Sequence, residues 1–199
     1  MNLGIFGGTF DPPHIGHQIL AAEAMDQLNL DQVLWVLTHY PPHKKEQKIT
    51  PLADRIRMVE LTIQDNSNFI LSRVDIDRSQ PHYALDTVLL LREKYPQDVL
   101  FYLMGMDSLN DLPAWHLPSK FVSACDGIVV MNRHGQRKMK ASVLDEIPGL
   151  ENKLKFLETP LIEISSSEIR DRIKRGKEYR YFLPDKVFRY IQEKSLYRS

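Results

Sequence analysis

The feature of this sequence that most constrains its fold is a recurring pair, a short apolar strand followed by an amphipathic helix. Apolar runs rich in Val, Ile and Leu are typical of strands that helices cover on both faces of a parallel sheet. We predict strands over residues 3–6, 33–38, 69–74, 99–104, 128–131 and 154–157. We predict helices over residues 14–28, 52–63, 84–95, 120–124, 166–175 and 185–194. This alternation predicts an α/β fold built on a doubly wound parallel sheet, with a ligand crevice at the carboxyl ends of its strands.

Length and composition indicate how this sheet is organised into domains. A chain of 199 residues, 43% of them hydrophobic, is of the usual size for one globular domain. The sequence contains no low-complexity tract, solenoid repeat or long Pro/Ser-rich linker. We therefore expect a single domain over residues 1–199, in which the part from about 164 to 199 is helical. The stretch up to Pro118 that follows the fourth strand is expected to be rich in loops, and a charged connection is expected before the last strand.

Charge and cysteine content exclude several classes of function. Basic and acidic residues number 26 each, which argues against a protein built to coat nucleic acid. The single cysteine, Cys125, cannot form an internal disulfide and is expected to be a small buried residue. No segment approaches the ~20 apolar residues that span a bilayer, and the N-terminus lacks the basic and apolar regions of a signal peptide. We expect a cytoplasmic protein with neither nucleic acid nor a membrane as a partner.

The loop GGTFDPPHIGH, after the first predicted strand, is the most informative stretch of the chain. Gly7 and Gly8 allow a sharp turn and a close approach to a ligand. His14 and His17 share a face in the first turn of the next helix, where N–H groups and the helix dipole favour an anion. Gly16 leaves room for phosphate or ribose. The loop is neither a phosphate loop ending in Gly-Lys-Ser/Thr nor a GxGxxG fingerprint, and no third ligand for a zinc ion is apparent. We interpret the histidines as functional, with a structural role as the alternative.

A second group of polar residues opens the helix predicted after residue 165. A serine N-cap explains one of the three hydroxyls of Ser165–Ser167. Together with Arg170, one turn later, these hydroxyls are typical of a polyphosphate cradle. Lys44 and Lys45, on a loop made rigid by prolines, can supply further charge to phosphates, although a solvated loop is the alternative.

Two segments near the fourth predicted strand suggest contacts to a nucleoside. Gly105 permits close approach, and Asp107 can accept hydrogen bonds from ribose hydroxyls or can serve only as a helix cap. Trp115 lies in a proline-flanked loop, where its ring can stack on a pyridine ring; an ordinary core position is the alternative. Trp35, within an apolar strand, is interpreted as core.

The HxGH sequence resembles the signature of the nucleotidyltransferase superfamily, which includes cytidylyltransferases, phosphopantetheine adenylyltransferases and nicotinate mononucleotide adenylyltransferases. Four further segments along almost the whole chain resemble the bacterial nicotinate mononucleotide adenylyltransferases. They are PPHK (41–44), HYALDT (82–87, similar to SYTxDT), MGMDSLNDLPAWH (104–116, similar to xGxDxxxxLxxW) and ISSSEIRDRI (164–173, similar to ISSTxIR). The resemblance implies a Rossmann-like nucleotidyltransferase fold with C-terminal helices.

The resemblance also implies a reaction, in which the AMP part of ATP joins nicotinic acid mononucleotide to give deamido-NAD and pyrophosphate. It implies Mg²⁺ bound with ATP, bridging phosphate oxygens without a set of protein metal ligands. The expected catalytic residues are His14, His17 and Arg170. The expected ATP-binding residues are Gly7, Gly8, Thr9, Phe10, Gly16, Gly105, Asp107, Ile164, Ser165, Ser166 and Ser167. The expected mononucleotide-binding residues are Lys44, Tyr83, Ala84, Asp86, Thr87, Trp115 and His116.

Departures from the family pattern leave some points open. Ala84 stands where the family usually has threonine, His82 where serine is common, Ser167 where threonine is usual, and His116 often corresponds to tyrosine. Nicotinamide mononucleotide therefore remains an alternative acceptor, whereas the tryptophan segment and PPHK argue against a pantetheine phosphate. A nucleotide-binding regulator without catalysis is an alternative of another class. The basic run over residues 133–140 is either a solvated connection or a segment that reaches the triphosphate. The sequence leaves open whether the chain forms a homo-oligomer.

Overall fold

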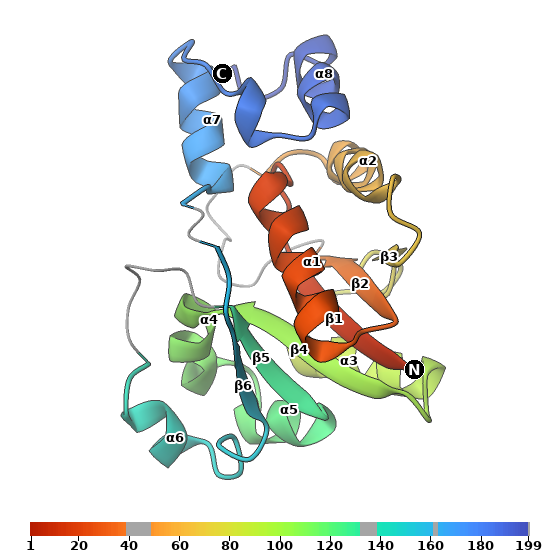
Figure 1. The fold of residues 1–199 in the computed structure, drawn as a ribbon, viewed down its shortest axis with the longest axis vertical. Coiled ribbons are helices and arrows are strands. Elements are labelled where there is room, and N and C mark those ends of the chain that lie inside the picture. The colour runs from red at the N-terminus through yellow and green to blue at the C-terminus, as the bar shows by residue number, and fades with distance from the viewer. Residues whose placement is uncertain (39–48, 132–138, 161–162, 199) are drawn as a thin grey trace.

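A six-stranded parallel sheet forms the centre of the protein (Figure 1). The computed structural model describes residues 1–38, 49–131, 139–160 and 163–198. The strands are β1 (Asn2–Gly8), β2 (Gln32–Leu37), β3 (Phe69–Ser72), β4 (Val99–Gly105), β5 (Gly127–Met131) and β6 (Leu154–Leu157). Their order is β3-β2-β1-β4-β5-β6, with every neighbouring pair parallel. The chain winds in opposite directions from β1 and β4, which confirms the predicted doubly wound sheet.

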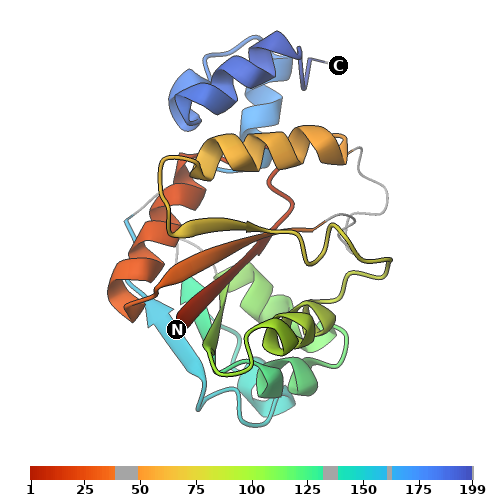
Figure 2. The same cartoon turned by 90° about the vertical axis from the view of Figure 1, so that its right-hand side faces the viewer.

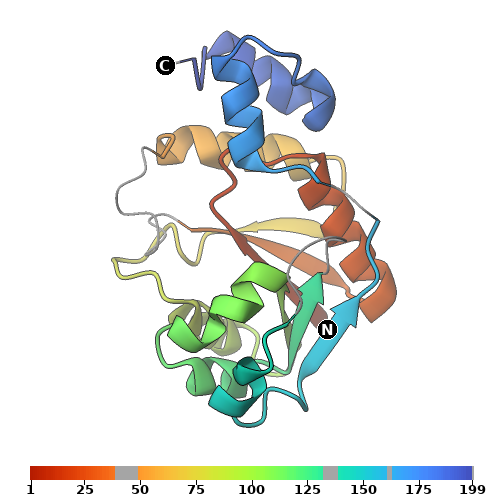
Figure 3. The same cartoon turned by 90° about the vertical axis from the view of Figure 1, so that its left-hand side faces the viewer.

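Helices cover both faces of the sheet, as the apolar strands require (Figures 2 and 3). On one face, α1 (Ile15–Leu28) and α2 (Leu52–Ile63) bury a cluster that includes Leu20, Val59 and the predicted core residue Trp35. The other face is covered by α3 (Ala84–Lys94), α4 (Met106–Asp111), α5 (Pro118–Ala124) and α6 (Ser142–Glu146). The positions predicted for the strands and the longer helices are therefore confirmed.

The C-terminal part forms a small helical unit against the outer side of α2 (Figure 1). It consists of α7 (Ser166–Lys174), the short 3-10 helix η3 (Arg180–Phe182) and α8 (Asp185–Glu193). Ile169, Ile173, Val187 and Ile191 bury their side chains with Met58 of α2 in one apolar cluster. This cluster places the start of α7 near the loop that follows β1.

One prediction about a loop is wrong, and one short helix was not predicted. The stretch expected to be rich in loops after β4 contains α4 and the 3-10 helix η2 (Leu112–Ala114), because Met106, Leu109 and Leu112 turn one apolar stripe into the core. The expected charged connection after β5 contains α6, whose Val143 is fully buried. In both places polar residues between the apolar ones obscure the helical period.

Cys125 is buried, as expected, and burial raises the pKa of its thiol to about 12. In the part of the chain that the structure describes, no helix is both long and apolar enough to cross a membrane.

Candidate active site

A cavity of about 480 Å³ opens at the carboxyl ends of β1 and β4, where the strand order reverses. Gly7 and Gly8 line it from β1, and Met104 and Gly105 line it from β4. Its volume is typical of a pocket for a small molecule. The structure thus places a cavity where the sequence predicted a ligand crevice.

The cavity brings together many of the residues predicted from the sequence. Those that line it are Gly7, Gly8, Thr9, His17, Tyr83, Ala84, Thr87, Gly105, Asp107, Trp115 and His116. Other predicted residues are not part of the lining, namely Phe10, His14, Gly16, Asp86, Ile164, Ser165, Ser166, Ser167 and Arg170. Lys44 and Lys45, with the PPHK segment, and most of the basic run over 133–140 lie outside the described residues.

The two histidines form a stacked pair at the start of α1. His14 is the N-cap residue, and its backbone N–H donates to Nδ1 of His17 at 3.1 Å. The two rings stack with their centroids 3.7 Å apart. His14 is almost completely buried, whereas His17 lines the cavity. Because Nδ1 of His17 accepts a hydrogen bond, the neutral ring carries its proton on Nε2, the nitrogen that can donate to a phosphate oxygen.

The start of α7 contacts the loop that follows β1. Ser166 Oγ donates to the carbonyl oxygen of Pro12 at 2.8 Å, and Arg170 Nη1 donates to that of Asp11 at 2.6 Å. Ser165 is the N-cap, and its Oγ accepts from the backbone N–H of Glu168. One of the three serines is therefore a helix cap, as the sequence suggested. Ser166 and Arg170, predicted to hold phosphates, contact the loop between β1 and α1 in the structure.

Arg55 of α2 is a buried residue of the site that the sequence analysis missed; its side chain is 1% exposed. Its guanidinium donates to three backbone carbonyls, those of Thr9 at 3.1 Å, Thr38 at 2.8 Å and Thr50 at 3.0 Å. Thr9 and Thr38 both line the cavity. Arg55 therefore joins the loop after β1 to the end of β2 and the start of α2.

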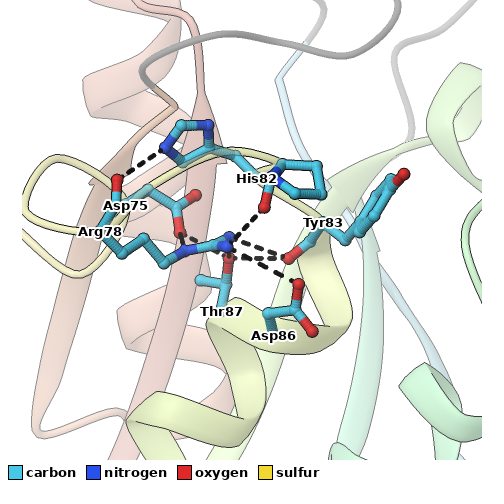
Figure 4. Close-up of polar contacts among 7 residues, drawn as sticks. Asp75, Arg78, His82, Tyr83, Asp86 and Thr87 are labelled. Atoms are coloured by element: carbon cyan, nitrogen blue, oxygen red, sulfur yellow. Dashed lines mark hydrogen bonds and ion pairs between the residues drawn. The ribbon is translucent and has the colours of Figure 1, made fainter.

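Arg78, between β3 and α3, binds residues that line the cavity near the start of α3 (Figure 4). Arg78 Nε donates to Asp75 Oδ1 at 3.0 Å, and Arg78 Nη2 donates to the carbonyl oxygen of Tyr83 at 3.2 Å. Thr87 Oγ1 donates to the same Asp75 oxygen at 2.7 Å. Asp75, which is buried and lines the cavity, was missed from the sequence. It follows the end of β3 as Asp107 follows β4, and that position is the signal that could have found it.

Asp86, predicted to bind the mononucleotide, lies outside the cavity lining and beside Arg78. Its carboxylate lies 3.6 Å from Arg78 Nη1 (Figure 4), and the side chain is 42% exposed. Asp107, by contrast, is exposed and lines the cavity from the first turn of α4. Gly105 is the N-cap of α4, so the alternative that Asp107 only caps a helix is wrong.

Aromatic rings form one wall of the cavity. The Tyr83 and His116 rings stack with their centroids 4.1 Å apart. Trp115 is half-buried, packs against Phe121 and Tyr102 and also lines the cavity, so it is more than an ordinary core residue. Burial, with a smaller contribution from Asp75, raises the pKa of Tyr102, whose hydroxyl therefore stays protonated. Tyr102, which also lines the cavity, gave no signal in the sequence because it lies within a buried strand.

Comparison with known proteins shows which family and which proteins this chain is similar to. Residues 5–172 match the family described as cytidylyltransferase-like. The chain is 38% identical to the nicotinate-nucleotide adenylyltransferase of Bacillus subtilis over 197 residues, covering 99% of this chain and 98% of that protein. It is 40% identical to a protein of Thermomicrobium roseum with the name probable nicotinate-nucleotide adenylyltransferase, covering 99% of this chain and 92% of the relative.

Solved structures show the same fold. The nicotinic acid mononucleotide adenylyltransferase of Plasmodium falciparum, complexed with NaAD, superimposes with a TM-score of 0.80 at 22% identity. That match covers 98% of this chain and 97% of the other. The same protein complexed with APC superimposes with a TM-score of 0.77, covering 98% of this chain and 96% of the other.

Proposed function

We infer that this chain, which belongs to the nicotinate-nucleotide adenylyltransferases of the cytidylyltransferase-like family, joins the AMP part of ATP to nicotinic acid mononucleotide. The products are deamido-NAD and pyrophosphate, and the reaction is a step of NAD biosynthesis. The observation that carries this proposal is one cavity with anion-binding groups at one end and an aromatic wall beside a helix start at the other. Such a cavity can bind ATP and the mononucleotide next to each other, as the reaction requires.

The reaction needs little more than positioning and charge stabilisation. The attacking phosphate oxygen of the mononucleotide is already anionic near neutral pH, so no catalytic base is required. The barrier comes from bringing two anions together and from charge that develops on the α-phosphate and the departing pyrophosphate. We assign His17 Nε2–H as the donor to the α-phosphate, and Gly8, Thr9 and Phe10 as the loop around the triphosphate. His14 orients His17 through its backbone N–H and the ring stack.

We assign the β- and γ-phosphates to the start of α7. A guanidinium has five N–H donors, so Arg170 can contact the Asp11 carbonyl and a phosphate at the same time. Ser167 would add a hydroxyl donor, whereas Ser166, whose hydroxyl proton goes to the Pro12 carbonyl, would hold the loop beside the phosphates. Mg²⁺ would enter this site bound to ATP. Among the described residues, no group of three or more His, Cys, Asp and Glu side chains could hold a metal ion. The charge of Mg²⁺ would offset that of the leaving pyrophosphate.

We assign the mononucleotide to the start of α3 and the aromatic wall. The N-cap residue of α3, Tyr83, makes no side-chain hydrogen bond to the helix, and Ala84 lines the cavity. Backbone N–H groups at such a helix start can bind the nicotinate carboxylate. Trp115 would stack on the pyridine ring, and Asp107 would accept from ribose hydroxyls.

The remaining expectations belong to the same proposal. The chain would act as one domain in the cytoplasm, with ATP and nicotinic acid mononucleotide as its partners and neither nucleic acid nor a membrane.

The test is to incubate the pure protein with ATP, Mg²⁺ and either nicotinic acid mononucleotide or nicotinamide mononucleotide, and to separate the products by chromatography. We expect the deamido dinucleotide to form much faster. Comparable rates would show an enzyme that accepts both acceptors. Pyrophosphate release only with another acceptor would overturn the substrate assignment, and ATP binding without pyrophosphate release would favour a nucleotide-binding regulator.

A further inference from the structure

The C-terminal end of the chain returns to the loop that follows β1. The hydroxyl of Tyr197 donates to Asp11 Oδ1 at 2.6 Å, across 186 residues of sequence. Tyr197 is half-buried, whereas the Asp11 carboxylate is almost completely buried. Burial, and then the charge of Asp11, raise the pKa of Tyr197. The hydroxyl therefore keeps its proton and remains a donor to this carboxylate.

Asp11 joins three parts of the structure. Its Oδ1 accepts from Tyr197, and its Oδ2 accepts from the backbone N–H of Thr50, just before α2, at 3.2 Å. Its carbonyl oxygen accepts from Arg170 of α7 at 2.6 Å. A buried carboxylate is stable only where hydrogen bonds replace water, so the donors to Asp11 determine where this part of the loop lies.

The position of Asp11 in sequence ties these contacts to the site. It lies two residues after Thr9, which lines the cavity, and three residues before His14, the N-cap of α1. Its neighbour Pro12 is held in turn by Ser166. A shift of Asp11 is therefore transmitted to Thr9 on one side and to the histidine pair on the other.

We propose that Tyr197 is a positioning residue for the loop between β1 and α1 (residues 9–14), which it holds in place through Asp11. Docking of the C-terminal segment then sets the affinity for the triphosphate of ATP and leaves mononucleotide binding unchanged. This inference rests on the proposed function, because it takes the loop of Thr9 and His17 as the ATP-phosphate site.

Tyr190 provides a matched control. Its hydroxyl donates to Asp54 Oδ1 at 2.7 Å, and this pair also joins the C-terminal helices to α2. The pKa of Tyr190 is raised to about 12, by burial first and by Asp54 second. The hydrogen bonds that the structure describes for the Tyr190–Asp54 pair do not reach residues 9–14. Tyr197→Phe and Tyr190→Phe each remove one hydroxyl that binds one carboxylate. Because Asp11 is more buried than Asp54, a purely structural role predicts a larger loss of Tm in Tyr197→Phe but no selective loss of ATP binding.

The first experiment measures steady-state kinetics and thermal unfolding of both variants. We expect Tyr197→Phe to lower kcat/KM for ATP about tenfold while KM for nicotinic acid mononucleotide stays within about twofold. Tyr190→Phe should lower Tm less and keep kinetics within about twofold of wild type. Unchanged ATP kinetics in Tyr197→Phe, or the same kinetic loss in both variants, would overturn the inference.

A second experiment separates this inference from the proposed function. Calorimetry gives the Kd for ATP with Mg²⁺ in wild type, in Tyr197→Phe, in Asp11→Asn and in the double variant. If the two residues act through each other, the double variant should lose less ATP affinity than the sum of the single losses. Wild-type protein that binds ATP but makes no dinucleotide would refute the proposed function alone, because the four Kd values still decide the role of Tyr197. Additive losses, or no loss in Tyr197→Phe, would refute the inference even in an active enzyme.

Discussion

The two ends of the cavity are held in place by contacts of very different range. At the phosphate end, residues 9–12 are held by Arg55, Ser166, Arg170 and Tyr197, which are 46, 154, 159 and 186 residues away from their partners. At the mononucleotide end, the Arg78 network joins residues at most 12 positions apart. The Arg78 network of the mononucleotide end can therefore form with the segment between β3 and α3. The phosphate end is complete only when the C-terminal helices have docked.

The sharpest test of this comparison is His17→Ala at the phosphate end. Removal of the proposed donor to the α-phosphate should lower kcat by about 10²- to 10³-fold, because this interaction strengthens in the transition state. KM for nicotinic acid mononucleotide should change little, and circular dichroism should show an unchanged fold. Near-normal turnover in a folded variant would remove His17 from the catalytic role and leave it as a structural partner of His14.

Arg55→Lys tests whether the phosphate end depends on this one buried side chain, which joins three segments of the chain. A lysine cannot reproduce the planar fork that reaches three carbonyls, so partners of Arg55 lose their hydrogen bonds. We expect a loss of about 2–3 kcal/mol in the free energy of unfolding, measured in urea, and a fall of about tenfold or more in kcat/KM for ATP.

Arg57→Lys is the control for Arg55→Lys. Arg57 lies on the same helix, but its side chain is 54% exposed and it pairs with Glu60 at the surface. Such pairs contribute about 0–1 kcal/mol, so stability and kinetics should stay near those of wild type. Equal effects of the two substitutions would contradict the prediction that the hydrogen bonds of Arg55 hold the phosphate end in place.

Arg78→Lys makes the complementary test at the mononucleotide end. The substitution removes the fork that binds Asp75 and the Tyr83 carbonyl, and so loosens the start of α3. We expect KM for nicotinic acid mononucleotide to rise about 5- to 10-fold while KM for ATP stays within about twofold. The control is Arg73→Lys, because Arg73 forms an exposed pair with Asp77 in the same segment. A matching rise in KM for ATP would contradict the independence of the two ends.

The same contrast explains what the sequence could predict. Strand and helix positions follow from local periodicity. Motifs such as HxGH and the serine-rich helix start can be recognised within a few consecutive residues. Arg55 and Tyr197 carry no such signal, because each is defined by partners on other elements that only the folded chain brings near. Asp75 could have been found by its place after a strand end. The helices α4 and α6 were missed because they are short and their apolar residues are few.

Asp86→Asn should have the smallest effect, and it decides between two interpretations of one residue. The resemblance to the family implied a contact to the mononucleotide, whereas the structure places the carboxylate outside the cavity lining and 3.6 Å from Arg78. With 42% of the side chain exposed, water screens the attraction to Arg78, so the pair contributes less than about 1 kcal/mol. Asparagine keeps the shape and one oxygen, so KM for nicotinic acid mononucleotide should change less than about twofold.

Thr87→Val, which removes the buried hydrogen bond to Asp75, should raise the same KM further. If Asp86→Asn instead raises KM more than Thr87→Val does, the carboxylate contacts the substrate directly, and the mononucleotide end extends beyond the cavity that the structure describes.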